Sequence, residues 1–420
     1  MCQRAQLEYG RGVSELNPVV QRRALYVTAF FRALTTSLLG VLLGVYLAKL
    51  HITGAAFGAV ISSGLIGAAL AAVLATFVAD AFGRRRFLIG LALLSVVGTL
   101  AFAMSSSPVT LAVAAFIGML NGMGKDRGAA LILEQAVLPG TTTPDKRTEV
   151  IAWYTMLQDL GHATGALLAG IPTLLEATTA LREESPQRMT LIGCAVIGLV
   201  SVVLYARLSS SIEVKQGGVR APISPHTRAV LQKISALMSI DAIGGGFLTT
   251  ALLSYFFFTR FGASEGAIGA LFFGARLLNA VSHLGAAWLA KRIGLVNTMV
   301  FTHIPSSFLL ATVAFAPNFP VAAVLFLLRE GLVEMDVPTR QSYVMAVVEP
   351  EARTFASGVT NLVRLASWAV APALAGALMV GDSMYWPLVI GAAMKVTYDL
   401  LLWKAFKDLP PPEERVAQQP

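Results

Sequence analysis

Apolar stretches long enough to cross a membrane recur along the whole of this chain. Clear examples are Ala24–Leu50, Ala55–Ala79, Phe87–Met104, Leu191–Tyr205 and Leu295–Ala316. A helix of about 20 apolar residues crosses a hydrocarbon core of about 30 Å, and we count about twelve such segments. Hydrophobic residues make up 55% of the chain and charged residues only 13%, which is unusual for a soluble domain. The sequence therefore predicts an all-α membrane protein with about twelve transmembrane helices.

The basic residues are distributed unevenly between the two sets of loops. One set, with the N-terminal tail, carries most of the Lys and Arg residues, whereas the other holds only Lys49, Arg182, Arg188 and Arg260. Because Lys and Arg favour the cytoplasmic side, we expect a bacterial inner (plasma) membrane protein with both termini in the cytoplasm. The first 23 residues lack the apolar stretch of a signal peptide. The net charge of +8 is spread along one membrane face, so no nucleic-acid partner is expected.

The second half of the chain repeats the first. The stretch "PDKRT" begins at Pro144 and "PEART" at Pro350, an offset of 206 residues that also aligns Arg147 with Arg353. Earlier segments align best at 211, where Gly83 corresponds to Gly294. An even number of crossings in each half makes the repeats parallel. The expected units are a cytoplasmic tail (1–23), a six-helix bundle (24–206), a polar cytoplasmic linker (207–231), a second six-helix bundle (232–406) and a cytoplasmic tail (407–420).

A short loop after the second apolar run carries a family signature. The stretch "TFVADAFGRRR" resembles the Gly-x-x-x-Asp-Arg-x-Gly-Arg-Arg motif of the major facilitator superfamily at Asp80, Gly83, Arg84 and Arg85, although Thr76 and Ala81 replace the usual Gly and Arg. The second-half counterpart, "AWLAKRIG", has Lys291 where Asp is usual. The alternative is an ordinary basic loop at the membrane surface. The resemblance implies two six-helix bundles that rock about a site at the middle of the membrane.

The same resemblance suggests how the loop is held. Glu134 resembles the acid that many family members use to latch the Arg-rich loop, and its expected partners are Arg84–Arg86 or Arg147. Arg340 occupies the equivalent place in the second half, and Arg147 and Arg353 are expected at equivalent cytoplasmic corners.

The fifth predicted helix contains "GHATGALLAG". It resembles the antiporter motif of this superfamily at Gly161, Gly165 and Gly170, with Ala166 in place of Pro and Ala169 in place of Gly. Small residues four apart also allow ordinary close packing of two helices. Both interpretations stay open.

Charged residues lie inside the predicted spans, with as many acids as bases. Each would cost several kcal/mol if it faced lipid, so we expect them to face the interior, mostly as pairs. The candidates for a substrate or proton pathway are Arg32, Lys125, Asp126, Arg127, Asp159, His162, Asp241, Arg276, Glu330, Glu334, Asp336 and Arg364.

The densest of these charges is "GKDRG", Gly124–Gly128, which we expect near the middle of the fourth helix. Residues 125 and 127 of a helix point in different directions, so one cation needs a local partner, either Asp126 or an acid such as Asp159. His162, one turn from Asp159, is either a proton relay or a packed polar residue.

Pseudo-symmetry places the GKDRG cluster opposite the acids of the tenth helix. We expect Arg329 and Arg340 to neutralise Asp336. Glu330 and Glu334 are one turn apart, and two close carboxylates resist double ionisation. One of them is therefore expected to take up a proton near neutral pH, with Asp159 and His162 as the next candidates.

Together these features predict a secondary transporter. The chain has no nucleotide-binding loop, so the first hypothesis is proton-coupled efflux of a small organic solute by antiport. The alternative is uptake or exchange of an anionic metabolite, motivated by Arg32, Arg127 and Arg276. We expect a monomer without cofactor or metal, since the two cysteines are far apart and the five histidines form no His-x-x-x-His pair. An enzyme is not expected, and a non-transporting membrane sensor is a distant alternative.

Overall fold

The structure is a computed structural model that describes residues 17–181, 184–209, 225–337, 339–340 and 353–406. These residues are helical, without a strand among them. The first half contains α2 (Pro18–Lys49), α3 (Gly54–Phe77), α4 (Ala79–Phe82), α5 (Arg84–Ala103), α6 (Pro108–Gly118), α7 (Ala129–Val137), α8 (Arg147–Leu168), α9 (Ile171–Thr178) and α10 (Ser185–Ala206), with short 3₁₀ turns at Leu138–Thr141 and Pro144–Lys146.

The second half contains α11 (Pro225–Gly246), α12 (Thr250–Phe261), α13 (Glu265–Ile293), α14 (Leu295–Ala314), α15 (Phe319–Val333), α17 (Arg353–Leu378) and α18 (Trp386–Phe406), with a 3₁₀ turn at Gly381–Ser383. Eight described helical segments are long and apolar enough to cross a membrane by themselves. One of these segments, Leu231–Phe261, combines most of α11 with α12, and the shorter α6 and α7 together make a further crossing in two pieces. The predicted all-α fold of two related six-helix bundles is confirmed.

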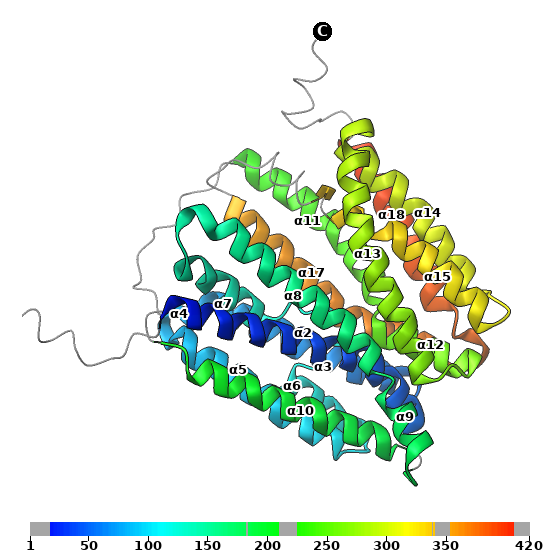
Figure 1. The fold of residues 1–420 in the computed structure, drawn as a ribbon. Coiled ribbons are helices and arrows are strands. Elements are labelled where there is room, and N and C mark those ends of the chain that lie inside the picture. The colour runs from blue at the N-terminus through cyan, green and yellow to red at the C-terminus, as the bar shows by residue number, and fades with distance from the viewer. Residues whose placement is uncertain (1–16, 182–183, 210–224, 338, 341–352, 407–420) are drawn as a thin grey trace, which may run out of the picture.

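The two bundles lie side by side, with α2 to α10 in one and α11 to α18 in the other (Figure 1). They meet mainly where α2 packs on α12, α3 on α17, and α8 on α13, with smaller contacts of α13 with α9 and α2. Helix starts follow local signals, since Asn17, Ser107, Thr249, Ser264 and Asn318 each accept a backbone hydrogen bond as the N-cap of a helix. Two apolar cores fill the first bundle and the bundle interface, and a third joins α11, α14 and α18.

The repeat is visible in the backbone. The helix α8 begins at Arg147, and Arg353, which follows it by the offset of 206 residues, lies in α17. Gly83 (φ 102°) and Gly294 (φ 85°) separate consecutive helices at equivalent positions, a conformation that favours glycine.

Some predicted boundaries are wrong. The helix α2 begins at Pro18 rather than after residue 23, because Asn17 caps it and Pro18 suits the first turn. Residues 225–231, predicted as linker, belong to α11. Residues 1–16 of the predicted N-terminal tail, residues 210–224 of the predicted linker and the whole predicted C-terminal tail lie outside the described residues.

Small residues bring the bundles into close contact at one end. A Cβ atom on Gly44 would lie 2.1 Å from the Ala251 carbonyl oxygen, and one on Gly58 would lie 2.4 Å from that of Pro372. Within the first bundle, Gly161 and Gly165 serve the packing of α8 on α2, since added Cβ atoms would lie 2.5 and 2.1 Å from backbone oxygens of α2. Gly170 lies against Gly266 of the other bundle. The association of this motif with antiport stays a prediction.

At the same end, polar side chains also connect the two bundles. Glu265, at the start of α13, is only 3% exposed. The Lys49 ammonium lies 3.1 Å from it and 2.6 Å from Glu176. Gln187 donates to Glu265 at 2.7 Å, and Thr173 donates at 3.2 Å. A second-half carboxylate is therefore held by three first-half side chains.

Candidate functional site

The fourth membrane crossing is broken at its middle. The helix α6 ends at Gly118, and α7 begins only at Ala129. The prediction of GKDRG inside a helix is therefore wrong. Gly124 (φ 67°) has a left-handed backbone conformation, which glycine adopts without strain, and Met119 (φ 53°) adopts it as the C-cap of α6. The break lets three successive charged side chains reach three separate partners.

Backbone carbonyls freed by this break are bound by the second bundle. The Ala251 amide donates to Gly122 O at 3.0 Å, and the Thr250 hydroxyl donates to Met123 O at 2.8 Å. The Arg276 guanidinium donates to Gly124 O at 2.9 Å. Unwound carbonyls at mid-membrane are typical of the binding sites of transporters.

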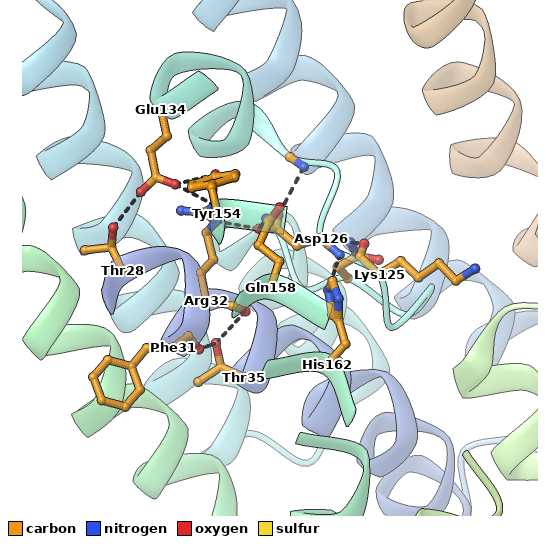
Figure 2. Close-up of polar contacts among 12 residues, drawn as sticks. Thr28, Phe31, Arg32, Thr35, Lys125, Asp126, Glu134, Tyr154, Gln158 and His162 are labelled. Carbon is orange, nitrogen blue, oxygen red and sulfur yellow. Dashed lines mark hydrogen bonds and ion pairs between the residues drawn. The ribbon is translucent and has the colours of Figure 1, made fainter. Parts of the chain in front are cut away.

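A buried ionic network surrounds Arg32 in the first bundle (Figure 2). The Arg32 guanidinium lies 2.6 Å from Asp126 and 2.9 Å from Glu134. Glu134 is fully buried and also accepts hydrogen bonds from the hydroxyls of Thr28, Tyr154 and Tyr205 at 2.6 to 2.7 Å. Four groups from three helices thus hold this carboxylate.

The predicted latch between Glu134 and the Arg-rich loop is therefore wrong. Glu134 points into the bundle, so its partners come from α2, α8 and α10. In the loop, Arg84 pairs instead with Asp80 at 2.7 Å, and Arg85 donates to the Ala206 carbonyl.

The predicted contacts of Asp126 and His162 are also revised. The backbone amide of Asp126 donates to His162 Nε2 at 2.9 Å, and Gln158 Nε2 donates to the Asp126 carboxylate at 3.4 Å. Asp159 is exposed on α8 and shares no hydrogen bond with His162. Because Nε2 accepts from the backbone, His162 acts here as a packed polar residue. Asp126 itself neutralises Arg32 rather than Lys125 or Arg127.

Lys125 links the two bundles. Its side chain points away from the Arg32 network (Figure 2), and its ammonium lies 2.5 Å from Glu334 Oε1 at the end of α15. His283 Nε2 lies 3.8 Å from the other carboxylate oxygen. Glu330 pairs with its neighbour Arg329. Each of the two acids expected to repel one another therefore has a cation of its own, and the uptake of a proton by one of them stays a prediction.

The second bundle has an ionic network around Asp241. This carboxylate lies 2.8 Å from the Lys395 ammonium and 3.0 Å from Arg340. Arg340 also pairs with Asp336 at 3.1 Å. This contact confirms one of the two cations predicted for Asp336, whereas the other, Arg329, pairs with Glu330. Sequence reasoning counted Lys395 among the intramembrane charges but did not select it for the site.

Two further residues join this network from α14 and α18. His303 Nδ1 lies 2.9 Å from the Asp399 carboxylate, and His303 Nε2 lies 3.5 Å from Lys395. Lys395 and Asp399 are four residues apart within one apolar span, a signal that could have identified them. No comparable signal in the sequence singles out His303.

Arg127 and Arg364 meet at Trp368. Their guanidinium carbons lie 5.7 and 5.5 Å from the centre of the Trp368 ring. Neither guanidinium has a carboxylate within 4 Å among the described residues. The sequence analysis proposed both arginines but missed Trp368, since a single aromatic residue in an apolar helix is unremarkable.

These side chains line a cavity of about 140 Å³ between the bundles. Of the described residues around it, seven are Lys or Arg and four are Asp or Glu. Candidates that line it are Lys125, Arg127, Asp241, Arg276, Glu330, Glu334, Asp336, Arg340 and Arg364. Arg32 and Asp126 line a separate cavity of about 120 Å³ inside the first bundle. His162 and Asp159 line neither cavity.

Comparison with known proteins identifies relatives over nearly the whole chain. The sequence model of the Major Facilitator Superfamily matches residues 25–328 and 234–420. The uncharacterized membrane protein YJR124C of Saccharomyces cerevisiae is 24% identical over 414 residues, covering 90% of this chain and 92% of the relative.

Solved structures are similar in fold. A mutant form of the nucleoside transporter NupG superposes with a TM-score of 0.73 at 16% identity, covering 92% of this chain and 100% of that chain. A bacterial homologue of the human lysosomal transporter Spinster, inward-facing and occupied, gives a TM-score of 0.69 at 13% identity, covering 92% and 96%.

Proposed function

The chain belongs to the major facilitator superfamily of membrane transporters, and on this premise we propose that it moves a small organic anion across the membrane by alternating access. The observation that carries the proposal is the cavity between the two bundles. Its described lining has seven basic and four acidic side chains. An excess of cations in a poorly hydrated cavity favours an anionic solute.

The proposed cycle uses the contacts between the bundles. Those described above lie at mid-height and toward the end that carries Lys49 and Glu265. The predicted topology puts this end outside, which makes the present state inward-facing, as is the matched Spinster homologue. Opening to the outside requires the Lys49–Glu265 pair to separate and the close glycine contacts to part.

A direct test uses purified protein in proteoliposomes. A panel of small carboxylates, their neutral amides and matched ammonium compounds would be offered on one side, with accumulation measured by counterflow. We expect saturable movement of anions only. Movement of the ammonium compounds in preference to the carboxylates would contradict the proposal.

Proton-coupled efflux is the second candidate, and the bridge between Lys125 and Glu334 favours it. Protonation of Glu334 would remove the charge that holds Lys125 at 2.5 Å, so a proton on this carboxylate would loosen one contact between the bundles. We predict that Glu334→Gln uncouples transport from an imposed proton gradient while downhill flux persists. Wild-type pH dependence with concentrative transport in this variant would exclude Glu334 as the coupling group.

The orientation has its own test. Reporters inserted near Gly217 and fused after Pro420 should read cytoplasmic, and one near Glu184 should read external, because Lys and Arg concentrate on one side. An external reading at Gly217 would overturn the proposed arrangement of two parallel halves.

A further inference from the structure

We propose that Arg127 and Arg364, which both lie over the ring of Trp368, form the subsite for a carboxylate group of the substrate, with a flat apolar part of the substrate lying against Trp368. The inference rests on the proposed transport of an organic anion and names the residues that recognise it. It assigns to Trp368 a role that neither the sequence motifs nor the ionic networks reveal.

The first argument is the pairing of the cavity's cations. Lys125 pairs with Glu334, Arg329 with Glu330, and Arg340 and Lys395 with Asp241. Arg276 donates to the Gly124 carbonyl. Of the seven Lys and Arg residues around this cavity, Arg127 and Arg364 alone have neither an ion pair nor a hydrogen bond with a described residue.

Holding two guanidinium groups without carboxylate partners in one membrane cavity costs free energy. Both contact the same ring, so their centres lie no farther apart than the sum of 5.7 and 5.5 Å. The Nε atom of Arg364 is buried without a hydrogen-bond acceptor. A contact with an aromatic face offsets only part of the cost of removing a cation from water. A carboxylate between the guanidinium groups would pair with both and offset one of their two positive charges.

The second argument is geometric. Arg364 and Trp368 are one helical turn apart on α17, so they share one face of that helix. Arg127 comes from the break in the first bundle, where its neighbour Asp126 is fixed by Arg32 at 2.6 Å. A carboxylate bound here would touch both bundles at once, which ties substrate binding to the closing of the bundles around it.

The third argument concerns the rest of the cavity. Phe272, Phe326, Leu248 and Leu253 line it together with Trp368, and its volume is about 140 Å³. Arginine binds planar carboxylates with two parallel hydrogen bonds. A small organic acid with a flat ring fits this combination of planar cations, aromatic surface and limited volume.

The test reports anion binding at Trp368 itself. The chain has five tryptophans, and replacing Trp153, Trp288, Trp386 and Trp403 by Phe leaves Trp368 as the single fluorophore. Quenching by iodide would be compared with quenching by caesium and by neutral acrylamide. Benzoate and benzamide would then be titrated as competitors of iodide.

We expect iodide to quench Trp368 several-fold more strongly than caesium, and benzoate to protect it while benzamide does not. Arg127→Gln and Arg364→Gln should each lower the benzoate affinity at least about tenfold, because a charge-assisted hydrogen bond is lost. Arg364→Lys should recover only part of the affinity, since lysine keeps the charge but not the planar fork.

The matched control is Arg260→Gln. Arg260 also lies over an aromatic ring, 5.6 Å from the centre of Phe261, but does not line the cavity. Its removal should leave both quenching and benzoate protection unchanged. Each variant is first checked for a single peak in size-exclusion chromatography and for a thermal transition like that of the parent.

Three outcomes would overturn the proposal: equal quenching by iodide and caesium, attraction of iodide without protection by benzoate (an adventitious ion only), or benzoate affinities unaffected by both Gln variants. The proteoliposome assay separates this failure from failure of the proposed function. Anion counterflow with an unchanged KM in both Gln variants rejects the subsite alone, whereas a lack of anion counterflow in the parent rejects the function.

Discussion

The two bundles use one symmetry-related position with reversed charges. In the first bundle Arg32 of the first crossing pairs with Glu134 of the fourth at 2.9 Å. In the second bundle Asp241 of the seventh crossing pairs with Arg340 of the tenth at 3.0 Å. Arg340 follows Glu134 by the repeat offset of 206 residues, and Asp241 follows Arg32 by 209. Because the early segments align at 211, Asp241 lies within one helical turn of the position equivalent to Arg32, and the ion pair between corresponding crossings recurs with its acid and base exchanged.

The surroundings of the two pairs differ more than the pairs themselves. Three hydroxyl groups complete the hydrogen bonding of Glu134, which lines neither of the two cavities described above, although its partner Arg32 lines the one inside the first bundle. The Asp241–Arg340 pair lines the central cavity, and the neighbouring Asp336 has a buried oxygen, Oδ1, without a hydrogen bond in the described part of the chain. From this difference we predict that the first network maintains the fold, whereas the second is available to a solute or a proton.

The largest effect is expected from Arg32→Gln. The substitution leaves Asp126 and Glu134 as two buried carboxylates without their shared cation, and losing one partner of a buried ion pair costs about 3–5 kcal/mol. We expect little folded protein and a strongly lowered thermal transition in detergent. A transition within a few degrees of the parent would mean that the first network is not structural.

Asp241→Asn should destabilise the protein less than Arg32→Gln does, and its main effect should be on transport. The residue is the hub of the second network, as Arg32 is of the first, but the central cavity lets water solvate Arg340 and Lys395 after the charge is lost. We expect a smaller loss of stability, about 1–3 kcal/mol, and loss of most transport.

Thermal stability and proteoliposome flux, measured on the same Asp241→Asn preparation, check this prediction. The matched comparison is Arg32→Gln. Equal destabilisation by the two variants, with transport retained in Asp241→Asn, would remove the distinction between the networks.

Exchanging the charges of the second pair sharpens the comparison. The double variant Asp241→Arg with Arg340→Asp gives the second bundle the polarity of the first. Adjacent charges couple by about 0.5–3 kcal/mol in double-mutant cycles, so the double variant should be more stable than the sum of the single variants predicts. Transport should stay low, because Lys395 and Asp336 then face like charges. Recovered transport would show that only neutrality matters at this position.

The sequence could predict the fold because its signals are long or repeated. Spans of apolar residues and the offset linking Arg147 to Arg353 depend on many residues at once. The individual contacts were harder to predict. The break at residues 119–128 was missed because its three glycines also suit helix packing. The assumption of a continuous helix then gave Lys125 and Asp126 the wrong partners.

The partners of Glu134 were missed for a related reason. A loop motif from the family suggested Arg84–Arg86, but tertiary packing brings Thr28, Tyr154 and Tyr205 to the carboxylate from three other helices. Hydroxyl groups in apolar helices give no periodic pattern. The same applies to Trp368 and His303, whose roles depend on contacts between segments far apart in the sequence.

The smallest effect on stability is expected from Asp80→Asn. This substitution tests the difference between the loop that contains Asp80 and its counterpart in the second half. The first-half loop has the acid Asp80, paired with Arg84 at 2.7 Å, whereas the second half has Lys291 at the equivalent place. The Asp80 side chain is half exposed, and exposed ion pairs contribute less than about 1 kcal/mol. The thermal transition should therefore hardly change.

Transport by Asp80→Asn should nevertheless fall. The pair fixes Arg84 at the start of α5, and the next residue, Arg85, binds the carbonyl at the end of α10, so the loop connects two helices whose ends must move together when the bundles rock. Lys291→Asn is the matched control, because the second-half loop lacks the acid. Initial rates in proteoliposomes containing equal amounts of protein decide the point: if Asp80→Asn and Lys291→Asn both transport at the parent rate, the motif serves only to anchor a basic loop at the membrane surface.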